Sequence, residues 1–198
     1  GERPFRAGQL FEWIHKHNAE RFSDMTSLSH DLQERLSSAA DVSRITLERK
    51  KHSGDGAIKF VFKLHDDNLI ETVFLPDKSR RTICVSSQVG CAFGCAFCAT
   101  GRMNLTRNLT AGEITDQFAA VERITGKSIT NIVFMGMGEP LHNYDNVIKA
   151  ASIFNSKIGK NIGARHITIS TVGLADKIAL YFKEGHNFNL AISLNAGS

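Results

Sequence analysis

Cys91-Ala-Phe-Gly-Cys-Ala-Phe-Cys98 is the stretch around which the rest of the chain is organised, because it places three thiols within eight residues. Soft thiolate ligands select zinc, copper(I) or iron–sulfur clusters. A structural zinc site needs four ligands, so zinc would have to recruit Cys84, seven positions upstream, or a histidine such as His142. The C-x3-C-x2-C spacing instead favours an iron–sulfur cluster held by Cys91, Cys95 and Cys98, with one iron left open.

Residues 81–198 alternate between strand and helix patterns. Strands are predicted near 81–86, 130–135, 165–170 and 188–194, and helices near 111–125, 144–156 and 173–183. Thr110 and Glu113 predict a capping box at the start of the first of these helices, and Gly126 predicts its end. Repeated βα units imply a parallel sheet with right-handed crossovers. The cysteine stretch follows the first strand, at the end where parallel barrels gather their sites.

Each predicted strand of this region has one apolar face and one small or polar face. The apolar positions are Ile83, Val85, Ile167, Ile169, Leu190, Ile192 and Leu194, and the positions between them include Cys84, Ser170 and Ser193. This pattern predicts an α/β fold with a partial (βα) barrel of about four parallel strands and a polar interior. Four strands cannot close a barrel, and the last would be an exposed edge. We therefore expect the sequence to be a fragment.

Two smaller parts are expected to precede this core. Residues 1–42 predict a small helical accessory domain with Ser29 as an N-cap, and its residues alone favour structural support over RNA contact. Residues 43–80 predict an antiparallel β-meander, because apolar and polar residues alternate through 58–64. Glu71 lies in the last strand of this meander, where a carboxylate is expected to face solvent.

Composition and charge are those of a globular protein. The formal net charge is +4, which permits a nucleic-acid partner without demanding one. No apolar run is long enough for a membrane helix, and no signal peptide opens the sequence. Clustered thiols without a secretory signal favour a reducing cytoplasm, where they bind metal more often than they form disulfides.

Polar groups also follow the other predicted strands. Met135-Gly-Met-Gly-Glu-Pro-Leu141 comes after the second strand, where its glycines let the backbone approach a ligand and Glu139 offers an anion to an ammonium group. Ser170 ends the third strand and Ser193-Leu-Asn195 ends the fourth. Each motif is weak alone, but the carboxyl ends of parallel strands meet at one edge of a barrel. Together they predict a ligand site there.

The cysteine stretch, with Phe97 immediately before its last cysteine, resembles the signature of the radical S-adenosylmethionine superfamily. The resemblance implies that the three cysteines bind a 4Fe–4S cluster whose open iron is chelated by S-adenosylmethionine, with Phe97 near the adenine. The whole chain resembles the RlmN/Cfr family of RNA adenine methyltransferases, and its RlmN members most closely. The stretches that carry this likeness are 4–13, 71–74, 84–91, 107–114 and 136–140.

The likeness also implies roles for single residues. The residues implied to bind S-adenosylmethionine are Gly138, Glu139, Ser170, Ser193, Leu194 and Asn195; relatives often have His at the position of Asn195. Glu71 would be the proton acceptor, and Cys84 would be the resolving thiol. The cysteine that carries the methyl group lies beyond the end of this sequence, so we expect these 198 residues not to complete turnover.

The implied reaction methylates C2 of adenosine in 23S rRNA and in tRNA beside the anticodon. Two molecules of S-adenosylmethionine are implied per turnover: one methylates a cysteine, and the other yields a 5′-deoxyadenosyl radical that activates this methyl group. A disulfide bond, a flavodoxin-type electron donor and a monomeric state belong to the same expectation. The alternatives are methylation at C8, a radical enzyme with another substrate, and a zinc-stabilised RNA-binding module.

Overall fold

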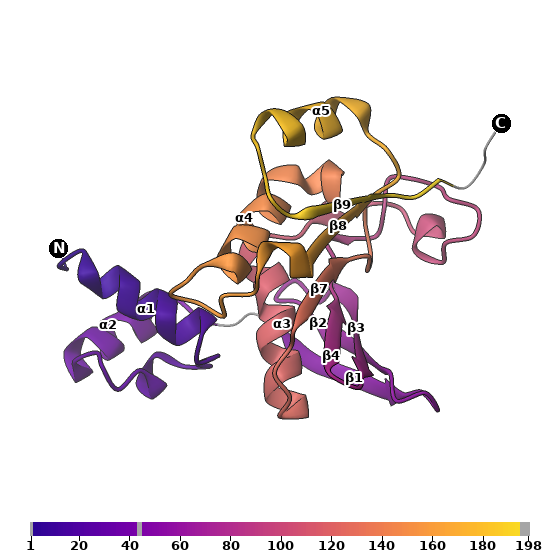
Figure 1. Ribbon diagram of the computed structural model, residues 1–198. Coiled ribbons are helices and arrows are strands. Elements are labelled where there is room, and N and C mark those ends of the chain that lie inside the picture. The colour runs from indigo at the N-terminus through magenta and orange to yellow at the C-terminus, as the bar shows by residue number, and fades with distance from the viewer. Residues whose placement is uncertain (1, 43–44, 195–198) are drawn as a thin grey trace.

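A seven-stranded sheet forms the centre of the molecule, in a computed structural model that describes residues 2–42 and 45–194 (Figure 1). In spatial order its strands are β1 (Thr46–His52), β2 (Ile58–Lys63), β3 (Leu69–Asp77), β4 (Arg80–Cys84), β7 (Asn131–Phe134), β8 (Ile167–Thr171) and β9 (Asn189–Ile192). Strands β1 to β4 pair antiparallel, whereas β4, β7, β8 and β9 pair parallel. The predicted meander and the predicted partial barrel are therefore both present, and β4 joins them into one sheet.

Three helices pack their apolar sides on one face of this sheet. They are α3 (Ala111–Thr125), α4 (Tyr144–Asn155) and α5 (Ala175–Lys183), each following a strand as the sequence predicts. Thr110 and Glu113 form the expected capping box, and the helix ends before Gly126. The main hydrophobic core lies between these helices and the apolar strand positions, such as Ile83 and Ile169, both of which are fully buried.

Strand β9 departs from the expected packing. Leu190 is partly buried against the core, but Ile192 is 49% exposed and Leu194 is 85% exposed. The reason is that β9 is the last strand of the sheet among the described residues, so no further strand or helix covers its end. The alternation of the sequence is present, but its apolar side is not packed there.

The N-terminal part has a small core of its own. Helices α1 (Phe5–His15) and α2 (His30–Ala39) enclose Phe22, Met25, Leu28 and Leu32. Ser29 occupies the predicted N-cap position of α2, but its side chain accepts no capping hydrogen bond. The Asn18 side chain donates to Glu122 of α3 over 2.8 Å, and this contact ties the N-terminal part to the core. Within the described ranges, no helix is long and apolar enough to cross a membrane.

Candidate functional site

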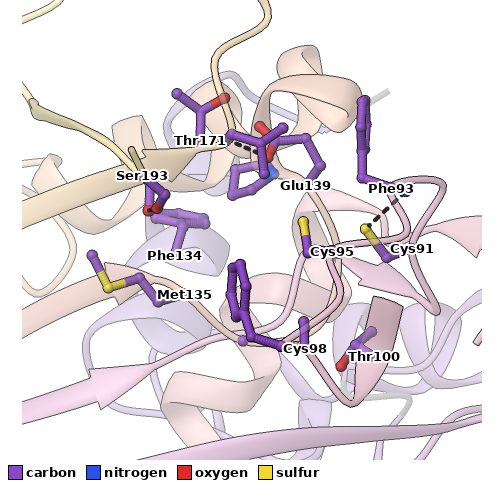
Figure 2. Close-up of a pocket in the computed structure, with 16 residues that line it drawn as sticks. Cys91, Phe93, Cys95, Cys98, Thr100, Phe134, Met135, Glu139, Thr171 and Ser193 are labelled. Atoms are coloured by element: carbon purple, nitrogen blue, oxygen red, sulfur yellow. Dashed lines mark hydrogen bonds between the residues drawn. The ribbon is translucent and has the colours of Figure 1, made fainter. Parts of the chain in front are cut away.

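A cavity of about 270 Å³ opens at the carboxyl ends of β7 and β8. The cysteine loop borders it on one side, and Glu139 and Ser193 border it on the other (Figure 2). The lining residues named in the sequence analysis are Cys91, Cys95, Phe97, Cys98, Gly138, Glu139, Ser170 and Ser193. The structure thus brings together, in one concave site, groups that are separated by more than 100 residues in the sequence.

The cysteine loop is held at its base by two short strands. Strand β5 (Gln88–Val89) pairs with β6 (Arg107–Asn108), so the two ends of the loop between them are held side by side. Gly90 makes the exit turn with φ 75°, and a Cβ there would lie 2.0 Å from the carbonyl oxygen of Asn104. Only glycine fits this close approach. The fold therefore fixes where the loop begins and ends.

The four cysteines are all free thiols. Among the described residues, no three His, Cys, Asp or Glu side chains lie close enough to hold a single metal ion. A zinc ion requires ligand atoms about 2.0–2.3 Å away on all sides. Cys91, Cys95 and Cys98 all line one cavity, and soft thiolates are the ligands that iron–sulfur clusters take. The donor set of Cys91, Cys95 and Cys98 accordingly fits an iron–sulfur cluster.

Glu139 is a buried polar group of the cavity, held on both of its carboxylate oxygens. It is only 3% exposed, and its two carboxylate oxygens accept hydrogen bonds from the backbone N–H groups of Leu141 and Val172, each over 3.0 Å. These contacts fix the carboxylate between the loop after β7 and the end of β8. Each oxygen keeps further acceptor capacity. The group can therefore receive an ammonium donor from a ligand in the cavity.

Two serines from neighbouring strands meet at the same cavity. The hydroxyl oxygens of Ser170 and Ser193 lie 3.4 Å apart. Leu194 does not line the cavity and is largely exposed, unlike the two serines. Asn195 lies outside the described residues. The structure thus gathers Gly138, Glu139 and the two serines, but it does not bring Leu194 to them.

Glu71 and Cys84 are not among the residues that line the cavity. Glu71 is half exposed and pairs with Lys59, whose Nζ lies 3.0 Å from its Oε2. Val73 lies two positions after Glu71 in β3, so the two residues project to the same face of the sheet. Val73 is directly opposite Cys84, and therefore Glu71 and Cys84 share that face. Burial raises the pKa of the Cys84 thiol to about 11, an effect that a contact with the backbone of Met135 partly offsets. Cys84 is therefore a protonated thiol at neutral pH.

Gln88 is a site residue that the sequence analysis missed. It is fully buried, and its Oε1 accepts the backbone N–H of Glu139 over 2.8 Å. Its Nε2 lies 2.7 Å from Asn108 Oδ1 and 3.0 Å from His142 Nδ1. Because a backbone N–H can only donate, the amide orientation is fixed and His142 Nδ1 must accept. Gln88 therefore joins the base of the cysteine loop to Glu139.

Gln88 lies within the 84–91 stretch that carries the family likeness, but no pattern marked it as a buried site residue, since a glutamine in a short strand is usually exposed. One feature that accompanies it is Gly138. A Cβ at position 138 would lie 2.5 Å from Gln88 Cβ, so the glycine allows the two segments to approach. The pairing of Gln88 with the second glycine of the Gly136-Met-Gly138 motif could have been found only from the folded chain.

Comparison with known proteins defines the class of this site. Residues 85–198 match the family model described as the radical SAM superfamily. This match covers more than half of the chain, so the chain belongs to the radical SAM superfamily. Membership implies S-adenosylmethionine and a 4Fe–4S cluster as cofactors, which agrees with the donor set at the cavity. Residues 1–42 match the model described as the ribosomal RNA large subunit methyltransferase N-terminal domain.

Individual relatives confirm the predicted likeness to RlmN. The chain is 50% identical over 196 residues to a "Dual-specificity RNA methyltransferase RlmN" of Pelobacter propionicus, a match that covers 99% of this chain and 56% of the relative. It is 47% identical over 206 residues to "Dual-specificity RNA methyltransferase RlmN 2" of Myxococcus xanthus, covering 100% and 54%. The chain spans about half the length of the curated relatives it matches.

A solved structure agrees with the predicted fold class. The crystal structure of a radical SAM methyltransferase from Sphaerobacter thermophilus superposes with a TM-score of 0.90 at 43% sequence identity. The match covers 97% of this chain and 57% of that one. The prediction of a partial radical SAM barrel is thereby confirmed.

Proposed function

We propose that this chain is part of a radical S-adenosylmethionine methyltransferase that methylates C2 of adenosine in 23S rRNA and in tRNA. One observation carries the proposal: three cysteines and a buried carboxylate border a single cavity at the carboxyl ends of parallel strands. The printed names of the relatives support RNA as the substrate. The choice of C2 over C8 rests on the likeness to RlmN.

The cysteine loop would hold the cluster. Cys91, Cys95 and Cys98 provide three thiolate ligands, and the cavity beside them leaves room for a further ligand on the fourth iron. When bound, the cluster and S-adenosylmethionine would supply the one-electron chemistry. The chain contributes position: the loop is anchored at β5 and β6, so its thiols are presented to a fixed site.

The facing wall would bind S-adenosylmethionine. Glu139 would accept the ammonium group, since a charge-assisted hydrogen bond in a buried place is strong. Ser170 and Ser193 would donate hydroxyl groups to the carboxylate and ribose, and Leu194 and Asn195 would complete this side. Gly138 lines the cavity and would bring its backbone close to the ligand, while its lack of a Cβ lets it pack against Gln88.

Glu71 and Cys84 would act on the RNA and on its methyl carrier. Glu71 would accept the C2 proton of the modified adenine. Cys84 would attack the sulfur of a second cysteine, the methyl carrier, once that sulfur is joined through its methylene carbon to the base. An S–S bond would form and the S–C bond would break, with its electron pair going to the carbon, which takes up a proton as the methylated adenine is released. Because the raised pKa keeps Cys84 protonated, it must lose a proton before it can attack. The proposal further includes use of two S-adenosylmethionine molecules per turnover, a flavodoxin-type donor, a monomer and a cytoplasmic location.

Mass spectrometry of RNA from cells that lack the gene tests this function. Loss of 2-methyladenosine from 23S rRNA and tRNA is the expected result. Unchanged 2-methyladenosine would contradict the proposal, and loss of 8-methyladenosine alone would favour C8 chemistry. As a second check, these 198 residues should yield no methylated adenine when incubated with RNA, reductant and S-adenosylmethionine.

A further inference from the structure

Basic side chains of β1 and β2 lie on the same face of the sheet as Cys84. Lys51 is directly opposite Lys59, Lys59 is opposite Val73, and Val73 is opposite Cys84. Residues directly opposite one another on neighbouring strands project to the same face. Arg49 lies two positions before Lys51 on β1, so it projects to this face as well. We call Arg49, Lys51 and Lys59 the basic row.

The basic row is close to the site but separated from it. Neighbouring strands lie about 4.8 Å apart, so Lys59 is about 10 Å and Lys51 about 14 Å from the strand position of Cys84. A nucleotide whose base reaches Cys84 therefore has room for its sugar and phosphates between the thiol and the row. In Figure 1 β1 and β9 lie toward opposite ends of the sheet. In the strand order β2 and β3 lie between β1 and β4.

The charges of Arg49 and Lys51 are available for a partner. Both residues are exposed, and within the described ranges neither has a carboxylate oxygen within 4.0 Å. Lys59, the third member of the row, already has a partner, since its Nζ lies 3.0 Å from Glu71. Lys63, outside the row, is also paired, with its Nζ 2.7 Å from Asp67. Two unpaired cations beside a catalytic face attract a polyanion.

A simpler reading of these charges is protection of the sheet edge. β1 is an edge strand, and lysines on edge strands discourage pairing with other chains. Lys50 serves that purpose equally well, but it is opposite Phe60 and therefore projects to the helix-covered face. Edge protection predicts that Lys50 and Lys51 are interchangeable. An RNA-binding role predicts that only Lys51 matters, so the two lysines form a matched pair for a test.

We propose that the basic row binds backbone phosphates of the RNA next to the target adenosine. Phosphate contacts fix the position of a nucleic acid without reading its sequence, which suits a chain whose relatives are named dual-specificity RNA methyltransferases. Lys59 contacts Glu71, so the row also orients the proposed proton acceptor relative to the RNA. This inference rests on the proposed function, because it takes RNA as the substrate.

Binding of an unmodified tRNA transcript, followed by fluorescence anisotropy over a range of salt concentrations, tests the row. The double variant Arg49→Gln, Lys51→Gln should lower the slope of log K against log salt by about 1.5, since each phosphate contact contributes about 0.7–0.9. At about 0.1 M salt this corresponds to an affinity loss of about 30-fold. Lys50→Gln should change affinity by less than about twofold, since it removes no phosphate contact.

Two results would overturn the proposed role of the basic row in RNA binding. One is a double variant whose affinity and salt slope equal those of Lys50→Gln; the other is a wild-type chain that does not bind tRNA at low salt. The proposed function fails separately, by persistence of 2-methyladenosine in cells that lack the gene. Thermal unfolding of each variant serves as the folding control, because all three residues are exposed.

Discussion

Replacing Gln88 with Met tests whether this residue couples the cysteine loop to Glu139. Met has a similar volume, so the substitution removes the amide without opening a large cavity. The buried N–H of Glu139 loses its acceptor, at a cost of about 1–3 kcal/mol. The contacts to Asn108 and His142 involve exposed side chains, which water can reach, and add about 1 kcal/mol. The free energy of unfolding should fall by about 2–4 kcal/mol in urea.

The same variant should bind S-adenosylmethionine about tenfold more weakly, because a shift of the Glu139 loop by a fraction of an ångström misplaces its carboxylate. Isothermal titration of the cluster-loaded chain measures this directly. Asn155→Ala is the control: it removes a 2.7 Å hydrogen bond to the Ile162 carbonyl away from the cavity, and should destabilise the fold without changing cofactor affinity. Unchanged unfolding and unchanged affinity in Gln88→Met would refute the coupling.

Three further changes have definite expected outcomes. Glu139→Gln removes the charge that would meet the ammonium group, so cofactor affinity should fall by about tenfold or more in the same titration, and an unaltered affinity would exclude this role. Arg107→Ala should flatten the dependence of the free energy of unfolding on acid pH. A hydrogen bond from Arg107 holds the pKa of Asp66 below its ordinary value. The stability that this ion pair contributes is therefore present above about pH 4 and is lost as pH falls further. Urea unfolding between pH 7 and pH 3 measures it, and equal profiles for the two proteins would contradict it. Gly90→Ala should abolish cluster assembly, because its Cβ would overlap the Asn104 carbonyl; normal iron content would count against the loop geometry.

Local sequence patterns predicted the elements of this fold well. Period-two alternation identified β2 and the strands of the barrel, and the Thr110–Glu113 capping box marked the start of α3 within one residue. These signals work because they depend on neighbours in the sequence. The cysteine spacing is a local signal of the same kind, and the structure brings Cys91, Cys95 and Cys98 to one cavity. Their role as cluster ligands stays a prediction.

Long-range pairings were not predictable in this way. The antiparallel pairing of β3 with β4, which joins the meander to the parallel strands, depends on register between two segments and not on the composition of either. Gln88 has no signal of its own, because its importance comes from Glu139, which lies 51 residues away. The exposure of Leu194 also escaped prediction, since alternation indicates a face but not whether anything covers it.

The central claim is that three thiols and Glu139 together form one cofactor site. Anaerobic reconstitution of the chain with iron and sulfide, followed by electron paramagnetic resonance of the reduced protein, tests it most directly. About four iron and four sulfide per chain are expected, with a spectrum that changes when S-adenosylmethionine is added. Glu139→Gln should keep the iron but weaken that spectral change. One zinc ion per chain, or a cluster whose spectrum does not change when S-adenosylmethionine is added, would contradict the claim.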